Sequence, residues 1–141
     1  MSHVFYRRMA YPHPLALRGE GVILWDGEGR RIIDACGGAA VVNVGHGVAE
    51  IAQAVADQAA AVAYVHPTAF TTGTLERYSR ELAPLVPLVD PRFYYLTSGS
   101  EGIEAAIKFA RQLQLARGEP ARDRVIARWG SYHGATLGAL A

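Results

Sequence analysis

Residues 97–102 read Thr-Ser-Gly-Ser-Glu-Gly, and this stretch decides the fold. Ser98 followed three positions later by Glu101 is a capping box, in which the serine hydroxyl accepts the Glu101 amide proton and the glutamate reaches back to the serine amide. The spacing predicts that a helix begins here. The preceding run 92–96, Arg-Phe-Tyr-Tyr-Leu, is short and aromatic, which favours a strand. The predicted order is strand, tight turn, helix.

The predicted helix runs to about Gly118 and can bind an anion at its start. Its apolar stripe indicates that the helix packs on a sheet, with the helix N-terminus at the carboxyl end of the preceding strand. The stripe consists of Ile103, Ala106, Ile107, Ala110 and Leu113. Gly99 lets a ligand approach the backbone, and the amides of residues 99–101 can point at an oxyanion together with the Ser100 hydroxyl. The alternative is a well-capped helix without a ligand, because capping boxes are common.

Upstream of this turn the patterns alternate between extended, irregular and helical. Strand-like runs at 22–25 and 31–33 around Asp-Gly-Glu-Gly predict a hairpin, and the glycine-rich segment 35–47 predicts an irregular, functional loop. Apolar residues at helical spacing predict helices over 48–65 and from 74 to about 85. Downstream, 124–127 predicts a second strand, followed by a loop over 129–136.

Composition limits the class of protein. Half of the 141 residues are hydrophobic and 19% are charged, which is enough apolar material for a core. The net charge of +1 comes without a basic run, so nucleic acid is not an expected partner. The single cysteine, Cys36, allows no internal disulfide, and we expect no metal site. There is no signal-peptide core and no run of eighteen apolar residues, which predicts a cytoplasmic protein without a membrane partner.

The stretch SGSEGIEAAIKFAR at 98–111, followed by SYHGATLGALA at 131–141, resembles the class III (omega) aminotransferases that depend on pyridoxal phosphate. The likeness covers nearly the whole chain, including LWDGEGRRIID at 24–34 and GGAAVVNVGHG at 37–47, in the family's order. It implies an α/β fold of the fold-type I class, incomplete in this chain. Residues 1–47 would belong to the small domain, and residues 48–141 would begin the large cofactor-binding domain.

The resemblance also implies a cofactor site for pyridoxal 5'-phosphate. Gly99 and Ser100 match the residues that hold the cofactor phosphate, and Tyr132 matches the aromatic residue that stacks on the pyridine ring, followed by His133 and Gly134. An electron-rich aromatic face suits a flat cationic heterocycle. The alternative for Tyr132 is a loop aromatic that fills the edge of the core.

The segment 37–47 resembles the part of the family that lines the substrate pocket. Many omega-transaminases have a bulky aromatic residue where this chain has Ala39 and Ala40, so a roomier pocket is expected. Phe70 falls in the region that the family places near the neighbouring subunit's active site, although such a residue is more often part of a core. Asn43 and His46 are expected to fix the loop rather than to touch substrate.

A transaminase needs an amine to bind the cofactor aldehyde, and Lys108 is the only lysine in the chain. It lies well outside the apolar stripe of its predicted helix, so it is expected at the surface. The family places the lysine, and the aspartate that pairs with the pyridine nitrogen, downstream of the 131–141 stretch. We therefore predict no catalytic residue in this chain and no activity from it alone, and we interpret it as part of a longer protein.

The function predicted by the resemblance is amino transfer between an amine or amino acid and an oxo acid, in a homodimer with shared active sites. Two alternatives stay open at this point. The same scaffold supports aminomutase, racemase or decarboxylase chemistry. Without a catalytic lysine, the chain could also be a non-enzymatic module that binds a phosphate or another protein. A general nucleotide-binding site is excluded because neither the G-x-x-x-x-G-K-[ST] nor the G-x-G-x-x-G pattern occurs between a strand and a helix.

Overall fold

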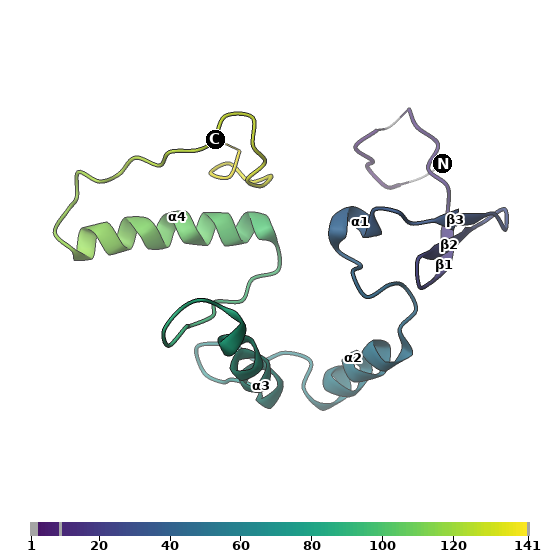
Figure 1. Ribbon diagram of the computed structural model, residues 1–141, viewed down its shortest axis with the longest axis horizontal. Helices are drawn as coiled ribbons and strands as arrows, with labels where there is room; N and C mark the ends of the chain where they lie inside the picture. Colours follow the sequence, from purple (N-terminus) through teal and green to yellow (C-terminus); the bar gives the residue numbers. More distant parts are fainter. Residues whose placement is uncertain (1–2, 9, 141) are drawn as a thin grey trace. The chain divides into compact units, whose positions relative to one another are not determined.

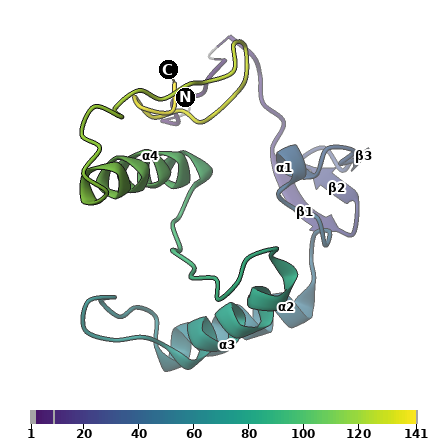
Figure 2. The same cartoon turned by 60° about the vertical axis from the view of Figure 1, so that its left-hand side comes forward.

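The structure is a computed structural model that describes residues 3–8 and 10–140. The chain divides into two compact units, Met1–Thr72 and Gly73–Ala141, and each is described by itself. The first unit contains a small sheet and two helices (Figure 1). The second contains two helices, a short 3-10 helix and a long segment that returns along the last helix (Figures 1 and 2).

The sheet of the first unit is antiparallel, in the order β1 (Ala16–Glu20), β2 (Ile23–Asp26) and β3 (Arg31–Ile33). The predicted hairpin is therefore confirmed as β2 and β3. Its turn is held by Asp26, only 3% exposed, whose carboxylate accepts the Glu28 and Arg30 amides at 3.0 and 2.9 Å. Arg30 Nε also donates to this carboxylate at 2.6 Å. β1 was not predicted, because Ala-Leu-Arg-Gly-Glu carries no clear alternation.

Two helices follow the sheet in the first unit, α1 (Gly37–Ala40) and α2 (Ala49–Ala61). The prediction of a helix over 48–65 is right for α2 and wrong at its end. Val62 is extended (φ −153°, ψ 102°), and its carbonyl accepts the Gln58 side-chain amide at 2.9 Å. The β-branched residues Val62 and Val65 lose side-chain freedom in a helix, which favours the extended exit.

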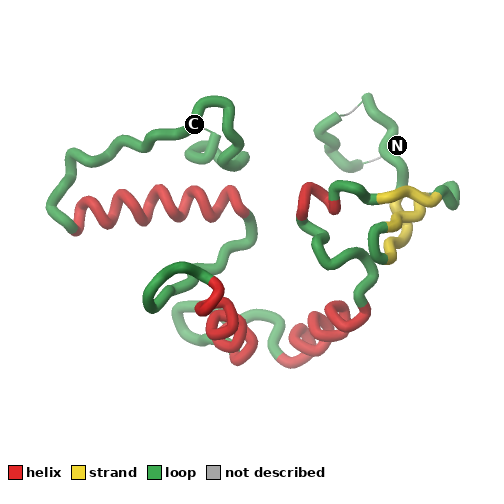
Figure 3. The backbone as a smooth tube through the Cα atoms, in the orientation of Figure 1, coloured by secondary structure: helices red, strands yellow, loops and turns green. Residues whose placement is uncertain are grey.

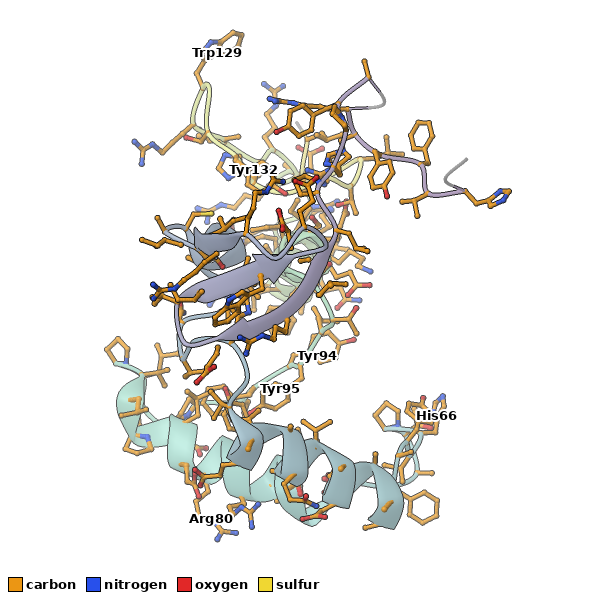
Figure 4. The ribbon with its side chains drawn as sticks, turned by 90° about the vertical axis from the view of Figure 1, so that its right-hand side faces the viewer. His66, Arg80, Tyr94, Tyr95, Trp129 and Tyr132 are labelled. Atoms are coloured by element: carbon orange, nitrogen blue, oxygen red, sulfur yellow. The ribbon has the colours of Figure 1, made fainter. Side chains whose placement is uncertain are left out.

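The second unit begins with α3 (Gly73–Leu82), which continues into the 3-10 helix η1 (Ala83–Leu85). Together they match the helix predicted from 74 to about 85. Tyr95 lies against α3: its ring centroid is 5.7 Å from that of Tyr78, and its hydroxyl is 2.9 Å from Ser79 Oγ (Figure 4). This contact fixes the segment that leads into α4 (Gly99–Ala116), the predicted long helix.

The predicted strands at 92–96 and 124–127 are not formed, which corrects the sequence-based expectation (Figure 3). Strands exist through hydrogen bonds to neighbouring strands. Among the described residues the one sheet is β1–β2–β3, and no strand pairs with either run. The second run is accordingly uncovered, with Ile126 98% exposed, and Trp129 just after it stands clear of the ribbon (Figure 4), whereas Phe93 in the first run is half-buried.

Burial is concentrated at the return to the start of α4. Among the described residues only Asp26, Gly134 and Ala139 are buried, and the last two lie in the segment that follows α4. Arg111 guides this segment back, because its Nη1 donates to the Pro120 carbonyl at 2.8 Å and to the Arg122 carbonyl at 3.3 Å. The fold therefore brings residues 134–139 to the N-terminal turns of α4 (Figures 1 and 2).

No helix in the described part of the chain has the combination of length and apolar character needed to cross a membrane.

Candidate functional site

The capping box at the start of α4 is present as predicted. Ser98 Oγ accepts the Glu101 amide at 3.2 Å, and Glu101 Oε2 accepts the Ser98 amide at 3.1 Å. The same carboxylate oxygen accepts the Thr97 hydroxyl at 2.5 Å and the Thr97 amide at 3.0 Å. The Thr97 hydroxyl, followed by its amide, lowers the pKa of Glu101. An ionised Glu101 thus holds the strand-like segment to the helix start.

The first two amides of α4 are free to bind a ligand. The amides at a helix start have no intrahelical partners, and those of Gly99 and Ser100 make no hydrogen bond within the described part of the chain. The Glu101 amide is used by Ser98, so the expectation of three ligand-facing amides is corrected to two. Apart from the adjacent residues and the backbone of α4 itself, no atom lies within 4 Å of the position that a Cβ on Gly99 would take, which leaves room for an anion at the positive end of the helix.

The segment that returns to α4 contacts the phosphate turn directly. The Ala135 amide donates to Ser100 Oγ at 2.9 Å, which leaves the Ser100 hydroxyl proton available to another acceptor. Gly134 has φ 146°, and a Cβ on it would lie 2.9 Å from Ser100 Oγ and 2.7 Å from the Ala139 Cβ. Glycine is required here by both the backbone angle and the close approach.

The two aromatic candidates precede this contact. Tyr132 is 82% exposed, so its ring is open to a ligand. His133 is half-buried, and its Nε2 is enclosed without a hydrogen-bond partner among the described residues. An enclosed nitrogen without a partner is uncommon in folded proteins. The structure thus brings Gly99 and Ser100 together with the loop that carries Tyr132 and His133.

Glu104 is a functional candidate that the sequence did not reveal. Its Oε1 accepts the Gly138 amide at 2.8 Å, and the Thr136 side chain, followed by the Gly138 amide, lowers the pKa of this carboxyl. No local pattern marks the residue, because its partners lie more than thirty positions away in sequence. Lys108, one turn further along α4, is exposed as predicted.

The predicted pocket loop contains one turn of left-handed backbone. Gly37, Gly38, Ala39 and Ala40 have φ of 53°, 63°, 64° and 64°. The turn is closed by the Ala40 amide on the Cys36 carbonyl at 2.8 Å and by the Val41 amide on the Gly37 carbonyl at 2.9 Å. For alanine this conformation costs roughly 1–2 kcal/mol per residue, so Ala39 and Ala40 are strained. The prediction of an irregular loop holds, but the sequence does not reveal the left-handed alanines.

The side chain of Asp34 holds this turn in place. Its Oδ1 accepts the Gly37 amide at 2.9 Å, and its Oδ2 lies 2.9 Å from His46 Nε2. His46, followed by the Gly37 amide, lowers the pKa of Asp34 against the opposing effect of its burial. His46 is itself tied to Gly21 by two backbone hydrogen bonds of 2.8 and 2.9 Å. His46 therefore fixes the loop, as predicted.

The remaining predicted pocket residues are exposed. Ala39 and Ala40 are exposed on the left-handed turn, and Phe70 is exposed in the connection between α2 and α3. The Phe70 amide donates to the His66 carbonyl at 3.1 Å, which closes a turn over residues 66–70.

The chain matches the aminotransferase class-III family over residues 6–141. An uncharacterized aminotransferase of Schizosaccharomyces pombe is 38% identical over 139 residues, which are 99% of this chain and 30% of the relative. A putrescine–pyruvate aminotransferase of Pseudomonas aeruginosa is 32% identical over 122 residues, which are 85% of this chain and 26% of the relative. A solved structure of a thermostable (S)-enantioselective omega-transaminase from Thermomicrobium roseum matches with a TM-score of 0.90 and 35% identity, over 99% of this chain and 32% of that one.

The chain spans about a third of the length of the proteins that it matches. The solved structure confirms the predicted fold class, part of the α/β fold of the transaminases. The match over nearly all residues, in the order that the sequence motifs indicated, shows that this chain belongs to the class III aminotransferase family.

Proposed function

We propose that the full-length protein is a pyridoxal-phosphate-dependent aminotransferase, which moves an amino group from an amine or amino acid to an oxo acid. The observation that carries this proposal is the phosphate turn. Two free amides and a serine hydroxyl stand at a capped helix start, and the loop with Tyr132 is fastened to that serine. The family to which the chain belongs supports the identity of the ligand.

The residues present fit the cofactor. The Gly99 and Ser100 amides and the Ser100 hydroxyl would donate to the phosphate, assisted by the dipole of α4. The Glu101 carboxylate turns back to donors at Thr97 and Ser98, which offset its charge at the helix start. The exposed Tyr132 would stack on the ring, and His133 would lie beside it. Pyridoxal phosphate supplies an aldehyde and an electron-withdrawing ring that accept an amino group and pass it on.

The substrate side of the proposal concerns the first unit. Ala39, Ala40 and Phe70 would line the pocket, and the two small methyl groups would leave space for a bulky amino donor. The strained turn supports this assignment, because strained backbone persists mostly where function requires it. A relative named for putrescine and pyruvate supports a small oxo acid such as pyruvate as the acceptor.

The larger organisation follows the family resemblance. Residues 1–47 would belong to the small domain and residues 48–141 to the large cofactor-binding domain of a fold-type I enzyme. The protein would act as a cytoplasmic homodimer with shared active sites, without nucleic-acid or membrane partners. The lone free Cys36 is compatible with a reducing compartment. We assign no catalytic residue within these 141 residues, because Lys108 is exposed on α4.

The test is an absorbance and trapping experiment on the full-length protein. Added pyridoxal phosphate should give a new absorbance band that borohydride fixes at one lysine, and an amine with pyruvate should yield alanine. The matched control is Lys108→Arg, which should keep both the adduct and the transfer. No borohydride-stable adduct, or an adduct located at Lys108, would contradict the proposal.

A further inference from the structure

The loop after Tyr132 is fastened to α4 at two points on one helix face. Ser100 Oγ accepts the Ala135 amide at 2.9 Å, and Glu104 Oε1 accepts the Gly138 amide at 2.8 Å. Residues four positions apart lie one above the other on a helix, so both acceptors face the same loop. Ser100 belongs to the proposed phosphate site, whereas Glu104 stands one turn behind it.

The loop packs closely against α4 at both points. A Cβ on Gly138 would lie 2.7 Å from Glu104 Oε2, so the carboxylate would have to move away, and a Cβ on Gly134 would lie 3.1 Å from the Ser100 Cα and 2.7 Å from the Ala139 Cβ. Ala139, next to the Glu104 contact, is 3% exposed. Most other apolar side chains in the second unit are exposed, so this contact is the best-packed part of its described residues.

The negative charge of Glu104 strengthens its hydrogen bond to the loop. A carboxylate that accepts a backbone amide makes a stronger bond than a neutral acceptor. The Gly138 amide donates to Glu104 Oε1 from the loop at 2.8 Å, and the positive charge of Lys108, one turn further along α4, contributes to lowering the pKa of this carboxyl. The carboxylate thus has a backbone donor on the loop and a cation on its own helix.

We propose that Glu104 is a positioning residue, which holds residues 136–139 on α4 and thereby fixes Tyr132 and His133 relative to the free amides of Gly99 and Ser100. The ligand part of this inference rests on the proposed function, since the fixed loop matters for pyridoxal phosphate. The structural part stands on the contacts alone. Glu104 acts through the loop and touches no ligand.

The test compares Glu104→Ala with Gln112→Ala in the full-length protein. Gln112 is exposed on the same helix and serves as the matched control. Hydrogen exchange of the ligand-free protein should become about tenfold faster over residues 134–140 in Glu104→Ala, because a hydrogen bond to a charged group is lost. Gly138→Ala should reproduce the effect without changing the carboxylate. Gln112→Ala should match the unmodified protein.

Ligand binding separates positioning from a purely structural role. Glu104→Ala should weaken both pyridoxal phosphate and pyridoxal about tenfold, because the ring contact is displaced while the phosphate donors stay. The ratio of the two affinities should therefore stay constant. Unchanged exchange in both Glu104→Ala and Gly138→Ala would overturn the proposal, and so would faster exchange with unchanged affinities.

Failure of the proposed function would look different. In that case the unmodified protein would bind neither ligand, and the ligand part of the inference would fall with it. The exchange of the ligand-free variants would still decide whether Glu104 holds the loop. If Glu104→Ala does not fold, Gly138→Ala carries both measurements.

Discussion

Two glycine-rich loops in this chain are each held by a carboxylate, and they differ in what the carboxylate holds. In the first unit, Asp34 accepts the Gly37 amide at 2.9 Å and fixes a turn with two left-handed alanines. In the second unit, Glu104 accepts the Gly138 amide at 2.8 Å, and no residue other than glycine has a positive φ between positions 132 and 139. The first loop is strained, whereas the second is relaxed.

The difference indicates how each loop would serve a ligand. The strained loop depends little on the rest of the chain: its hydrogen bonds run among residues 34–46 and to Gly21 and Val22 in the adjoining sheet. It would present a preformed wall. The relaxed loop depends on α4, and its partner Ser100 keeps a proton for a ligand. Under the proposed function, ligand binding and loop position would therefore be coupled in the second loop, and the two loops should respond differently to the same kinds of substitution.

The largest contrast is expected between alanine substitutions at Gly47 and Gly99. Gly47 has φ 70°, and a Cβ there would lie 2.6 Å from the Gly19 carbonyl oxygen. Gly47→Ala should therefore lower the free energy of unfolding by about 3 kcal/mol, from left-handed strain and overpacking together. A Cβ at Gly99 would meet no atom outside the adjacent residues and its own helix within 4 Å, so Gly99→Ala should not lower the free energy of unfolding. Urea titration measures this free energy for both variants, and an equal decrease in the two would refute the contrast.

The next effect concerns the cap of α4. Ser98→Ala removes the hydroxyl that accepts the Glu101 amide, so it should cost about 1 kcal/mol. Hydrogen exchange should become faster at the amides of Glu101 and Gly102 and stay unchanged over residues 34–47. Ser98→Asp, which keeps an acceptor, should restore protection. Faster exchange in the first loop would show that the two regions do not respond separately.

Glycine substitutions should have opposite signs in the two loops. Ala39→Gly or Ala40→Gly relieves left-handed strain but adds freedom to the unfolded chain, for a net stabilisation of about 0.5 kcal/mol each. Ala135→Gly relieves no strain, so only the added freedom of the unfolded chain remains, and this variant should be about 0.5 kcal/mol less stable. Thermal or urea unfolding compares the three variants. Destabilisation by Ala40→Gly would mean that the turn is not strained.

The smallest effect is expected from acid. His46 lowers the pKa of Asp34 below its ordinary value of 3.8, so the stabilisation is present above 3.8 and is lost as pH falls through the lower, folded value. Protection of residues 36–46 should decline only below about pH 4. Asp34→Asn should reduce that protection at neutral pH and remove its dependence on pH in the acid range. A pH-dependent loss that persists in Asp34→Asn would assign the effect to another group.

Local patterns predicted the parts of the fold whose cause is local. The capping box at Ser98 and Glu101 and the hairpin turn at Asp26 each depend on residues within a few positions, and both are present. The strands at 92–96 and 124–127 were wrong because a strand depends on its neighbours as much as on its own residues. The end of α2 was missed by a few residues for a local reason, the extended Val62.

The residues of the candidate site likewise divide into those with a local signal in the sequence and those that depend on contacts distant in the sequence. Gly99 and Ser100 follow from the helix start, and the resemblance adds Tyr132 and His133. Glu104 could not be predicted, because its partner Gly138 comes to it only through the return of the chain along α4. The left-handed conformation of Ala39 and Ala40 could not be predicted either, since alanine ordinarily avoids it.

The central claim is that the start of α4 binds the phosphate of the cofactor, and its most direct test compares two ligands that differ only in that group. The full-length protein should bind pyridoxal phosphate at least about a hundredfold more tightly than pyridoxal, because several charge-assisted hydrogen bonds depend on the phosphate. Ser100→Ala should reduce that ratio about tenfold, which is the share of one such bond. Equal affinity of the unmodified protein for the two ligands would contradict the account.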